Sequence, residues 1–143
     1  MRAVSHKAGP SIGALPFDIV VMDAQARHIR RKLITLQHGD ELLVDFPLTV
    51  MLEHGDLLLL DDGRTVEIIA AEEELMEVRA QDSSHLTLLA WHIGNRHLDA
   101  QIEPERLLLR RDKVIALMLE QLGATLEFVR EQFSPEHGAY HGH

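Results

Sequence analysis

The stretch LTLLAWHIGNRH, residues 86–97, joins a helical pattern to a short motif rich in histidine. Its apolar residues recur at spacings of three and four, which places them on one face of a helix. These residues are Leu86, Leu89, Ala90 and Ile93. Gly94 and Asn95 are typical of a helix end. The sequence therefore predicts a helix that stops at this pair and leaves His97 just beyond it.

The residues around this helix predict the order strand, helix, strand, strand, helix, strand. The strands are expected over 75–80, 97–102, 107–109 and 125–133. Ser83 or Ser84 can cap the first helix, and Asp112 the second, which Gly123 ends. The second helix is expected to bury Val114, Leu117, Met118 and Leu122. This order is that of the ferredoxin-like βαββαβ unit, which we assign to residues 75–134.

The first half of the chain has a different pattern, in which short apolar runs alternate with turn residues. The runs cover 19–22, 27–36, 41–46, 49–52, 57–60 and 66–71, and Pro47 is expected to end the third. Strands at this spacing predict a small all-β domain over residues 1–74. Residues 1–16 have no sustained period and are interpreted as a loose arm or a short edge strand. The acidic run 72–74 is interpreted as the junction, so the fold class is α+β.

Composition excludes several classes of protein. The formal net charge is −9, which argues against a protein that grips nucleic-acid phosphates. The chain has no cysteine, so disulfides and thiolate metal sites are excluded. It shows neither an apolar signal core nor an apolar run long enough to span a membrane. We therefore expect a cytoplasmic protein that binds neither membranes nor nucleic acid.

Histidine is the unusual residue, with 10 among 143, three of them in the last seven positions. The candidate metal ligands are His92, His97, His137, His141 and His143. Sites made only of imidazole suit nickel, copper and zinc, and affinity alone does not select nickel among them. A single imidazole binds such an ion weakly, so His97 needs a second chain or the tail. The ten residues after Phe133 reach at most about 33–36 Å.

A two-fold axis beside His97 would bring two copies of its imidazole together, because such an interface is self-complementary. The tail, residues 135–143, contains glycine and cannot bury a core, so we expect it to be flexible. A site of this kind exchanges its metal readily, which suits a carrier better than a catalyst. It should release metal as the pH falls through about 6.5, because only neutral imidazole binds metal.

Other interpretations stay open on the residues alone. His97 can be a hydrogen-bonded cap, and His92 a solvated helix position. A metal-dependent hydrolase would need a general base, and no carboxylate is placed near the motif to serve. A peptide-binding chaperone module would use the β domain and leave the histidines incidental. The basic residues Arg27, Arg30, Arg31 and Lys32 are interpreted as a solvated strand face, with a nucleic-acid patch as the alternative.

The motif His92-Ile93-Gly94-Asn95-Arg96-His97 resembles the hexamer of the UreE family of urease accessory proteins, which are nickel metallochaperones. The stretches His54-Gly55-Asp56-Leu57, Ala70-Ala71-Glu72 and Phe133 to Tyr140 are similar to that family too. The resemblance covers about residues 17–143. It implies a peptide-binding-like β domain followed by a ferredoxin-like metal-binding domain.

The resemblance also implies a function and partners. His97 would be the nickel ligand shared across a homodimer axis, and His137, His141 and His143 would be auxiliary ligands. The partners would be the GTPase UreG and the urease activation complex, with Ni²⁺ delivered to apo-urease and no catalysis by the carrier. Family members with further histidines on the strand after Pro104 differ from this chain, which has Arg110, Arg111 and Lys113 there.

Overall fold

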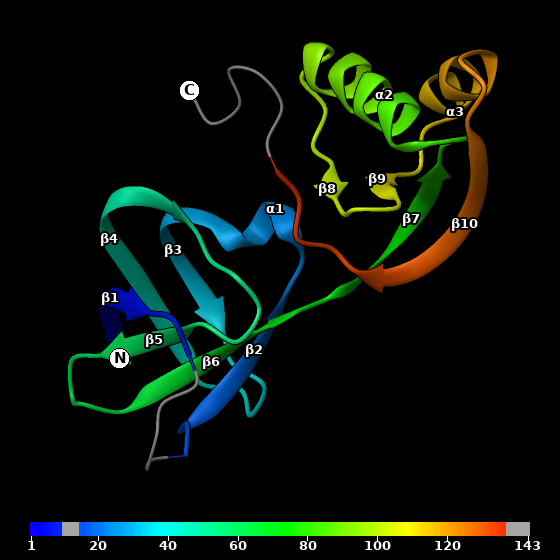
Figure 1. Ribbon diagram of the computed structural model, residues 1–143. Helices are drawn as coiled ribbons and strands as arrows, with labels where there is room; N and C mark the ends of the chain where they lie inside the picture. The colour runs from blue at the N-terminus through cyan, green and yellow to red at the C-terminus, as the bar shows by residue number, and fades with distance from the viewer. Residues whose placement is uncertain (10–14, 137–143) are drawn as a thin grey trace. The chain divides into compact units, whose positions relative to one another are not determined.

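Residues 1–9 and 15–136 are described by the computed structural model, and the chain divides into two units between Ala71 and Glu72. Each unit has its own sheet and its own apolar core (Figure 1). The first unit contains strands and one short helix, and the second contains strands and two longer helices. The predicted α+β class, a β domain followed by a ferredoxin-like domain, is confirmed. None of the described helices is long and apolar enough to cross a membrane.

The first unit is a six-stranded sheet with strand order β2-β6-β5-β1-β4-β3. Its elements are β1 (Arg2–Lys7), β2 (Asp18–Met22), α1 (Ala24–Arg27), β3 (His28–Thr35), β4 (Glu41–Met51), β5 (Leu57–Leu60) and β6 (Thr65–Ala70). Buried and half-buried residues alternate along β6, as expected for a strand with one face on the core. The fully buried Leu42, Val44 and Ile68 belong to that core.

Two expectations for this unit are wrong. The strand β1 is neither an arm nor an edge strand, because it lies between β4 and β5 with Ala3 fully buried. Pro47 does not end a strand, because β4 runs through it. The pairing of β3 with β4 shifts register between Ile29 and Arg31, and proline is tolerated where such an irregularity removes the need for its N–H.

The second unit contains β7 (Glu72–Arg79), α2 (Ser83–Asn95), β8 (Gln101–Ile102), β9 (Leu107–Arg110), α3 (Lys113–Gln121) and β10 (Thr125–Gln132). The strand order is β10-β7-β9-β8, and every neighbouring pair is antiparallel. Both helices lie on the same side of this sheet (Figure 1). Leu89 and Ile93 of α2, Leu119 of α3, and Met76 and Leu107 of the sheet form its core.

The acidic run 72–74 lies directly after the boundary between the two units, where it begins β7, and Glu73 pairs with Arg110 at 3.5 Å. Other details of this unit differ from the sequence prediction. The cap of α2 is Asp82 rather than a serine. The strand expected over 97–102 is reduced to the two residues of β8.

The buried face of α3 agrees with the prediction only in part, because Met118 and Leu122 pack against the core while Val114 and Leu117 do not. Leu119 is its buried residue, whereas Val114 and Leu117 are 76% and 59% exposed. Asp112 caps the helix as predicted, and its carboxylate accepts hydrogen bonds from the N–H groups of Val114 and Ile115 at 2.9 and 3.0 Å. Because the predicted apolar stripe is rotated relative to the observed one, α3 presents apolar side chains to solvent.

The sheet face opposite the helices carries a network of ion pairs centred on Arg106. Its guanidinium donates to Glu77 at 2.9 Å and to both carboxylate oxygens of Glu131 at 2.8 Å, and it pairs with Glu103 at 3.1 Å. Hydrogen bonds from Arg106 hold the pKa of both Glu77 and Glu131 below the usual glutamate range. The sequence pattern gave no sign of this network, because its members are far apart in the chain.

Candidate metal centre

The helix α2 holds His97 in a defined place. The helix begins at Asp82, whose carboxylate accepts a hydrogen bond from the N–H of His85 at 2.8 Å. Leu86, Leu89 and Ile93 are buried against the sheet, as predicted. A helix fixed at its start and along one face also fixes the residues that follow its end.

The end of α2 falls at the predicted pair and leaves His97 just beyond it. The helix runs to Asn95, with Arg96 as its cap. The N–H of His97 donates to the carbonyl of Gly94 at 3.0 Å, and the N–H of Leu98 donates to the carbonyl of Ile93 at 3.4 Å. These two bonds make a Schellman motif, in which His97 is the left-handed residue.

The backbone conformation of His97 is unusual. Its φ is +61°, and it is the only residue other than glycine with a positive φ in the part of the chain that the structure describes. The helix α3 ends in the same motif, with Gly123 at φ +90° donating to the carbonyl of Glu120 at 3.0 Å. A side chain in this conformation costs about 1–2 kcal/mol, which glycine avoids. Strain of this kind clusters at functional sites.

The surroundings of His97 suit a cation. The residue is exposed, at the C-terminal end of a helix of 13 residues. The last carbonyls of a helix carry a partial negative charge, which favours a positive ion near them. The imidazole is therefore presented to solvent from a fixed backbone, in a place where a bound cation is stabilised.

His92 lies one turn before the end of α2 and is half-buried. Its ring contacts the Trp91 ring edge to face, with centroids 5.1 Å apart and planes at 82°. Within residues 1–9 and 15–136, no group of three or more histidine, aspartate and glutamate side chains is arranged to hold a metal ion. The tail ligands predicted from the sequence, His137, His141 and His143, lie outside the described residues.

Other histidines have structural partners. The ring of His85 accepts a hydrogen bond from the N–H of Gln81 at 3.0 Å, and its Nε2 lies 2.8 Å from the carbonyl of Leu122. It therefore links the start of α2 to the end of α3. The Nδ1 of His54 accepts from the N–H of Ala70 at 3.0 Å.

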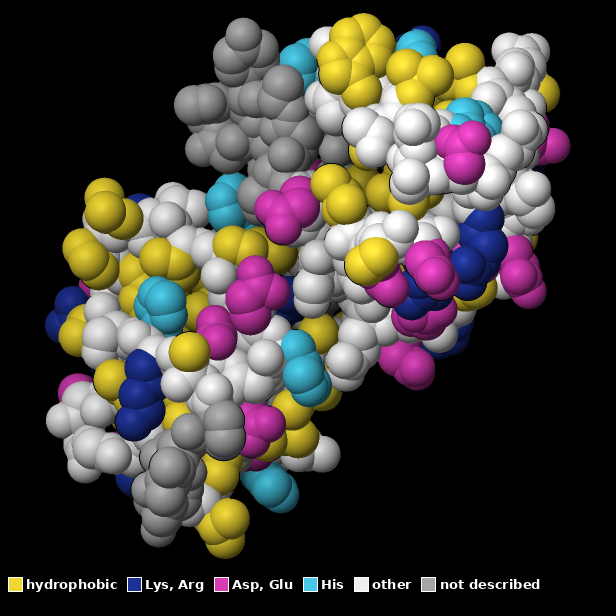
Figure 2. Space-filling view, viewed as in Figure 1, with side chains coloured by type: hydrophobic (Ala, Val, Ile, Leu, Met, Phe, Trp, Pro, Cys, Tyr) yellow, Lys and Arg dark blue, Asp and Glu magenta, His cyan; other side chains and the backbone are white. Residues whose placement is uncertain are grey.

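The solvent face of α2 is partly apolar. Leu88 and Trp91, three positions apart, are 50% and 62% exposed. Hydrophobic side chains and a histidine lie together over α2 at the top of Figure 2. This apolar surface belongs to α2, the helix that precedes His97.

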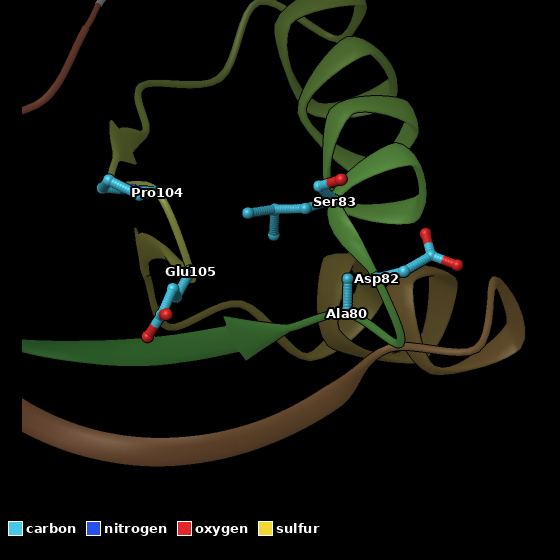
Figure 3. A pocket seen from close by; sticks show the side chains of 6 residues that line it. Ala80, Asp82, Ser83, Pro104 and Glu105 are labelled. Atoms are coloured by element: carbon cyan, nitrogen blue, oxygen red, sulfur yellow. The ribbon is translucent and has the colours of Figure 1, made fainter.

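A pocket of about 410 Å³ lies at the other end of α2. Pro104 and Glu105, from the connection between β8 and β9, stand opposite Ser83 and the first turn of the helix (Figure 3). A helix of 13 residues is about 20 Å long at 1.5 Å per residue. The pocket is therefore separate from His97 and is not part of the candidate metal centre.

Comparisons with known proteins agree over both units. Residues 3–71 match the family model of the UreE urease accessory protein, N-terminal domain, and residues 73–143 match that of its C-terminal domain. The chain is 54% identical over 136 residues to the urease accessory protein UreE 1 of Brucella suis, covering 95% of this chain and 84% of that protein.

Two further relatives are also similar over nearly the whole chain. The chain is 53% identical over 142 residues to the urease accessory protein UreE of Mesorhizobium japonicum, which covers 99% of this chain and 72% of the relative. It is 47% identical over 143 residues to that of Agrobacterium fabrum, which covers 100% of this chain and 89% of the relative.

Proposed function

The chain belongs to the UreE family of urease accessory proteins, and we propose that it carries Ni²⁺ to apo-urease during urease maturation. In this proposal it is a metallochaperone and not an enzyme. The proposal is supported by the matches to both family domains and by the urease accessory role in the names of the relatives.

The single observation that carries the nickel part of the proposal is the presentation of His97. His97 is exposed just beyond the C-terminal end of α2, on a backbone held by the Schellman motif. Imidazole nitrogen suits nickel, and also copper and zinc, so Cu²⁺ or Zn²⁺ are expected to bind as well. Because metal and proton compete for the imidazole, acidification is expected to release the ion.

We propose that a homodimer completes the site. A two-fold axis beside His97 supplies two imidazoles, and the exposed Leu88 and Trp91 supply apolar surface that each copy can bury against the other. His137, His141 and His143 act as auxiliary ligands that load or close the site, and His92 is a further candidate. The remaining partners are the GTPase UreG and the urease activation complex, in the cytoplasm.

A calorimetric nickel titration of the full chain tests the role of His97. The variant His97→Ala should lose the tightest binding event and lower the number of ions per dimer. The control is His38→Asn, which changes a histidine that already bonds to Asp18 at 2.8 Å, and it should bind nickel as the unchanged chain does. Unchanged affinity and stoichiometry in His97→Ala would remove His97 from the site.

A further inference from the structure

The strand β10 forms one edge of the second sheet. All eight of its residues, Thr125–Gln132, pair with β7 on one side. No described strand pairs with its other side, and Figure 1 shows β10 at the outer edge of this unit. An edge strand presents unpaired N–H and C=O groups, which another extended segment can use.

A groove lies beside this edge, on the helix side of the sheet. One stripe of α3, formed by Lys113, Ala116, Leu117 and Glu120, faces Phe128 of β10 and encloses about 580 Å³. The groove continues past Ala116 to Leu126. Phe128 is 66% exposed and Leu117 is 59% exposed, so apolar side chains line a space that is open to solvent.

Arg111 holds one end of the groove in place. Its guanidinium donates to the carbonyls of Leu75 and Val129, at 3.0 and 3.1 Å, and lies 4.6 Å from the centre of the Phe128 ring. The ring of Phe128 thus contacts a guanidinium that the main chain holds, while most of its surface stays exposed. Because the carbonyl of Val129 already accepts a hydrogen bond from Arg111, a partner strand is expected to pair with the residues of β10 that precede Val129.

The two faces of β10 favour different residues in a partner strand. Leu126 packs on the core under the helices, so Phe128, two positions later, lies on the same face. Glu127 points to the opposite face, where it is exposed and stands opposite Glu77 of β7. A strand added at this edge would place apolar side chains against Phe128 and, alternating with them, cations against Glu127.

A second copy of β10 does not meet this requirement. In an antiparallel pair built by a two-fold axis, opposite side chains lie on the same face of the sheet. Glu127 and Arg130 lie on opposite faces of β10, so Glu127 of one copy cannot stand opposite Arg130 of the other. The chain's net charge of −9 also favours a basic partner over a second acidic chain.

We propose that the edge of β10 and its groove bind an extended segment of a partner protein in which apolar residues alternate with lysine or arginine. The segment adds a strand to the sheet by main-chain hydrogen bonds, and its apolar side chains enter the groove beside Phe128. This interaction uses neither His97 nor nickel, so it stands apart from the carrier function.

Two synthetic ten-residue peptides test this proposal with the full chain. Valine alternates with lysine in one peptide and with glutamate in the other. The valine–lysine peptide should bind more tightly and should slow hydrogen exchange of the β10 amides. The variant Phe128→Thr should weaken its binding roughly tenfold, as loss of an apolar anchor does. The control is Val114→Ser, which removes an exposed apolar side chain of α3 that does not line the groove. This variant should bind the valine–lysine peptide as tightly as the unchanged chain does.

The charge preference gives an independent test that alters only an exposed side chain. The variant Glu127→Lys should reverse the order of the two peptides, so that the valine–glutamate peptide binds more tightly. The proposal is overturned if neither peptide slows exchange in β10, or if Glu127→Lys leaves the order unchanged. It is also overturned if the β10 amides become protected with rising protein concentration in the absence of peptide, because a second copy would then occupy the edge.

Discussion

At the scale of single residues, His97 carries a side chain in a left-handed backbone conformation that favours glycine. The two helices of the second unit end in the same hydrogen-bonding pattern, once with Gly123 and once with His97. Glycine is the residue that this conformation favours. The presence of an imidazole there is therefore explained better by the metal chemistry proposed for it than by the stability of the helix.

Replacing His97 by two different small residues should separate these effects. Alanine keeps the strain of a β-carbon at positive φ, whereas glycine relieves it. We expect His97→Gly to unfold with a free energy about 1 kcal/mol above that of His97→Ala, and both to lose nickel. Urea unfolding followed by the fluorescence of Trp91, which lies on the same helix, measures the difference. Equal stability of the two variants would show that the position carries no strain.

The sequence placed the helix end at Gly94-Asn95 and His97 just after it, but it did not show which residue is left-handed. Glycine favours left-handed backbone, yet the left-handed residue is His97, three positions after Gly94. The bonds from His97 and Leu98 back to the last turn decide the position, and single-residue preferences do not contain them. Arg106 was missed for a similar reason, since its partners Glu77 and Glu131 meet only in the folded sheet.

At the scale of elements, α3 shows the limit of reading helical faces from apolar spacing. The sequence around it offers two apolar stripes, one through Val114 and Leu117 and one through Ile115 and Leu119. Only the docking of the helix on the sheet decides between them, and it buries Leu119. The start of the helix was predictable, because Asp112 caps it through a local bond that the sequence contains.

The cap of α3 can be tested directly. Asp112→Ala removes the acceptor for two backbone N–H groups and should lower the free energy of unfolding by about 1 kcal/mol. Asp112→Asn keeps an acceptor oxygen and should lower it by much less. Denaturant unfolding of the three chains measures the order. A loss in Asp112→Asn as large as in Asp112→Ala would mean that charge, rather than the hydrogen bond, accounts for the effect.

At the scale of the whole molecule, the sequence predicted the two-part α+β architecture because the halves differ in pattern. Short apolar runs fill the first half, and helical spacing appears only after Ser83. The order of strands in the first sheet was not predictable. Its central strand β1 pairs with residues such as Leu43 and Leu60, which are distant in the chain, and local pattern carries no information on such pairing.

The network on Arg106 should make stability depend on acidity. The pKa values of Glu77 and Glu131 are lowered in the folded state, so they stabilise the fold above the unfolded glutamate pKa of about 4.3. This contribution is lost as the pH falls through their folded values. Unfolding measured from pH 7 down to pH 3 should therefore show stability falling below about pH 4.5.

A variant series identifies the source of that fall. Arg106→Met removes the shared donor, so the pKa values of both glutamates should return toward the usual range and the acid-induced loss should become smaller. Arg130→Met removes an exposed arginine from β10 that is outside the network, and it should leave the pH dependence unchanged. An identical pH profile in Arg106→Met would show that other groups cause the acid sensitivity.

The central place of β1 has a consequence for synthesis of the chain on the ribosome. Arg2–Lys7 leaves the ribosome well before its neighbours β4 and β5, which end only at Met51 and Leu60. We expect the first strand to remain exposed until translation has passed these residues, so that the first sheet closes late and slowly. Deleting Arg2–Lys7 should accordingly abolish the sheet, since it removes a middle strand and leaves the edges of β4 and β5 unpaired.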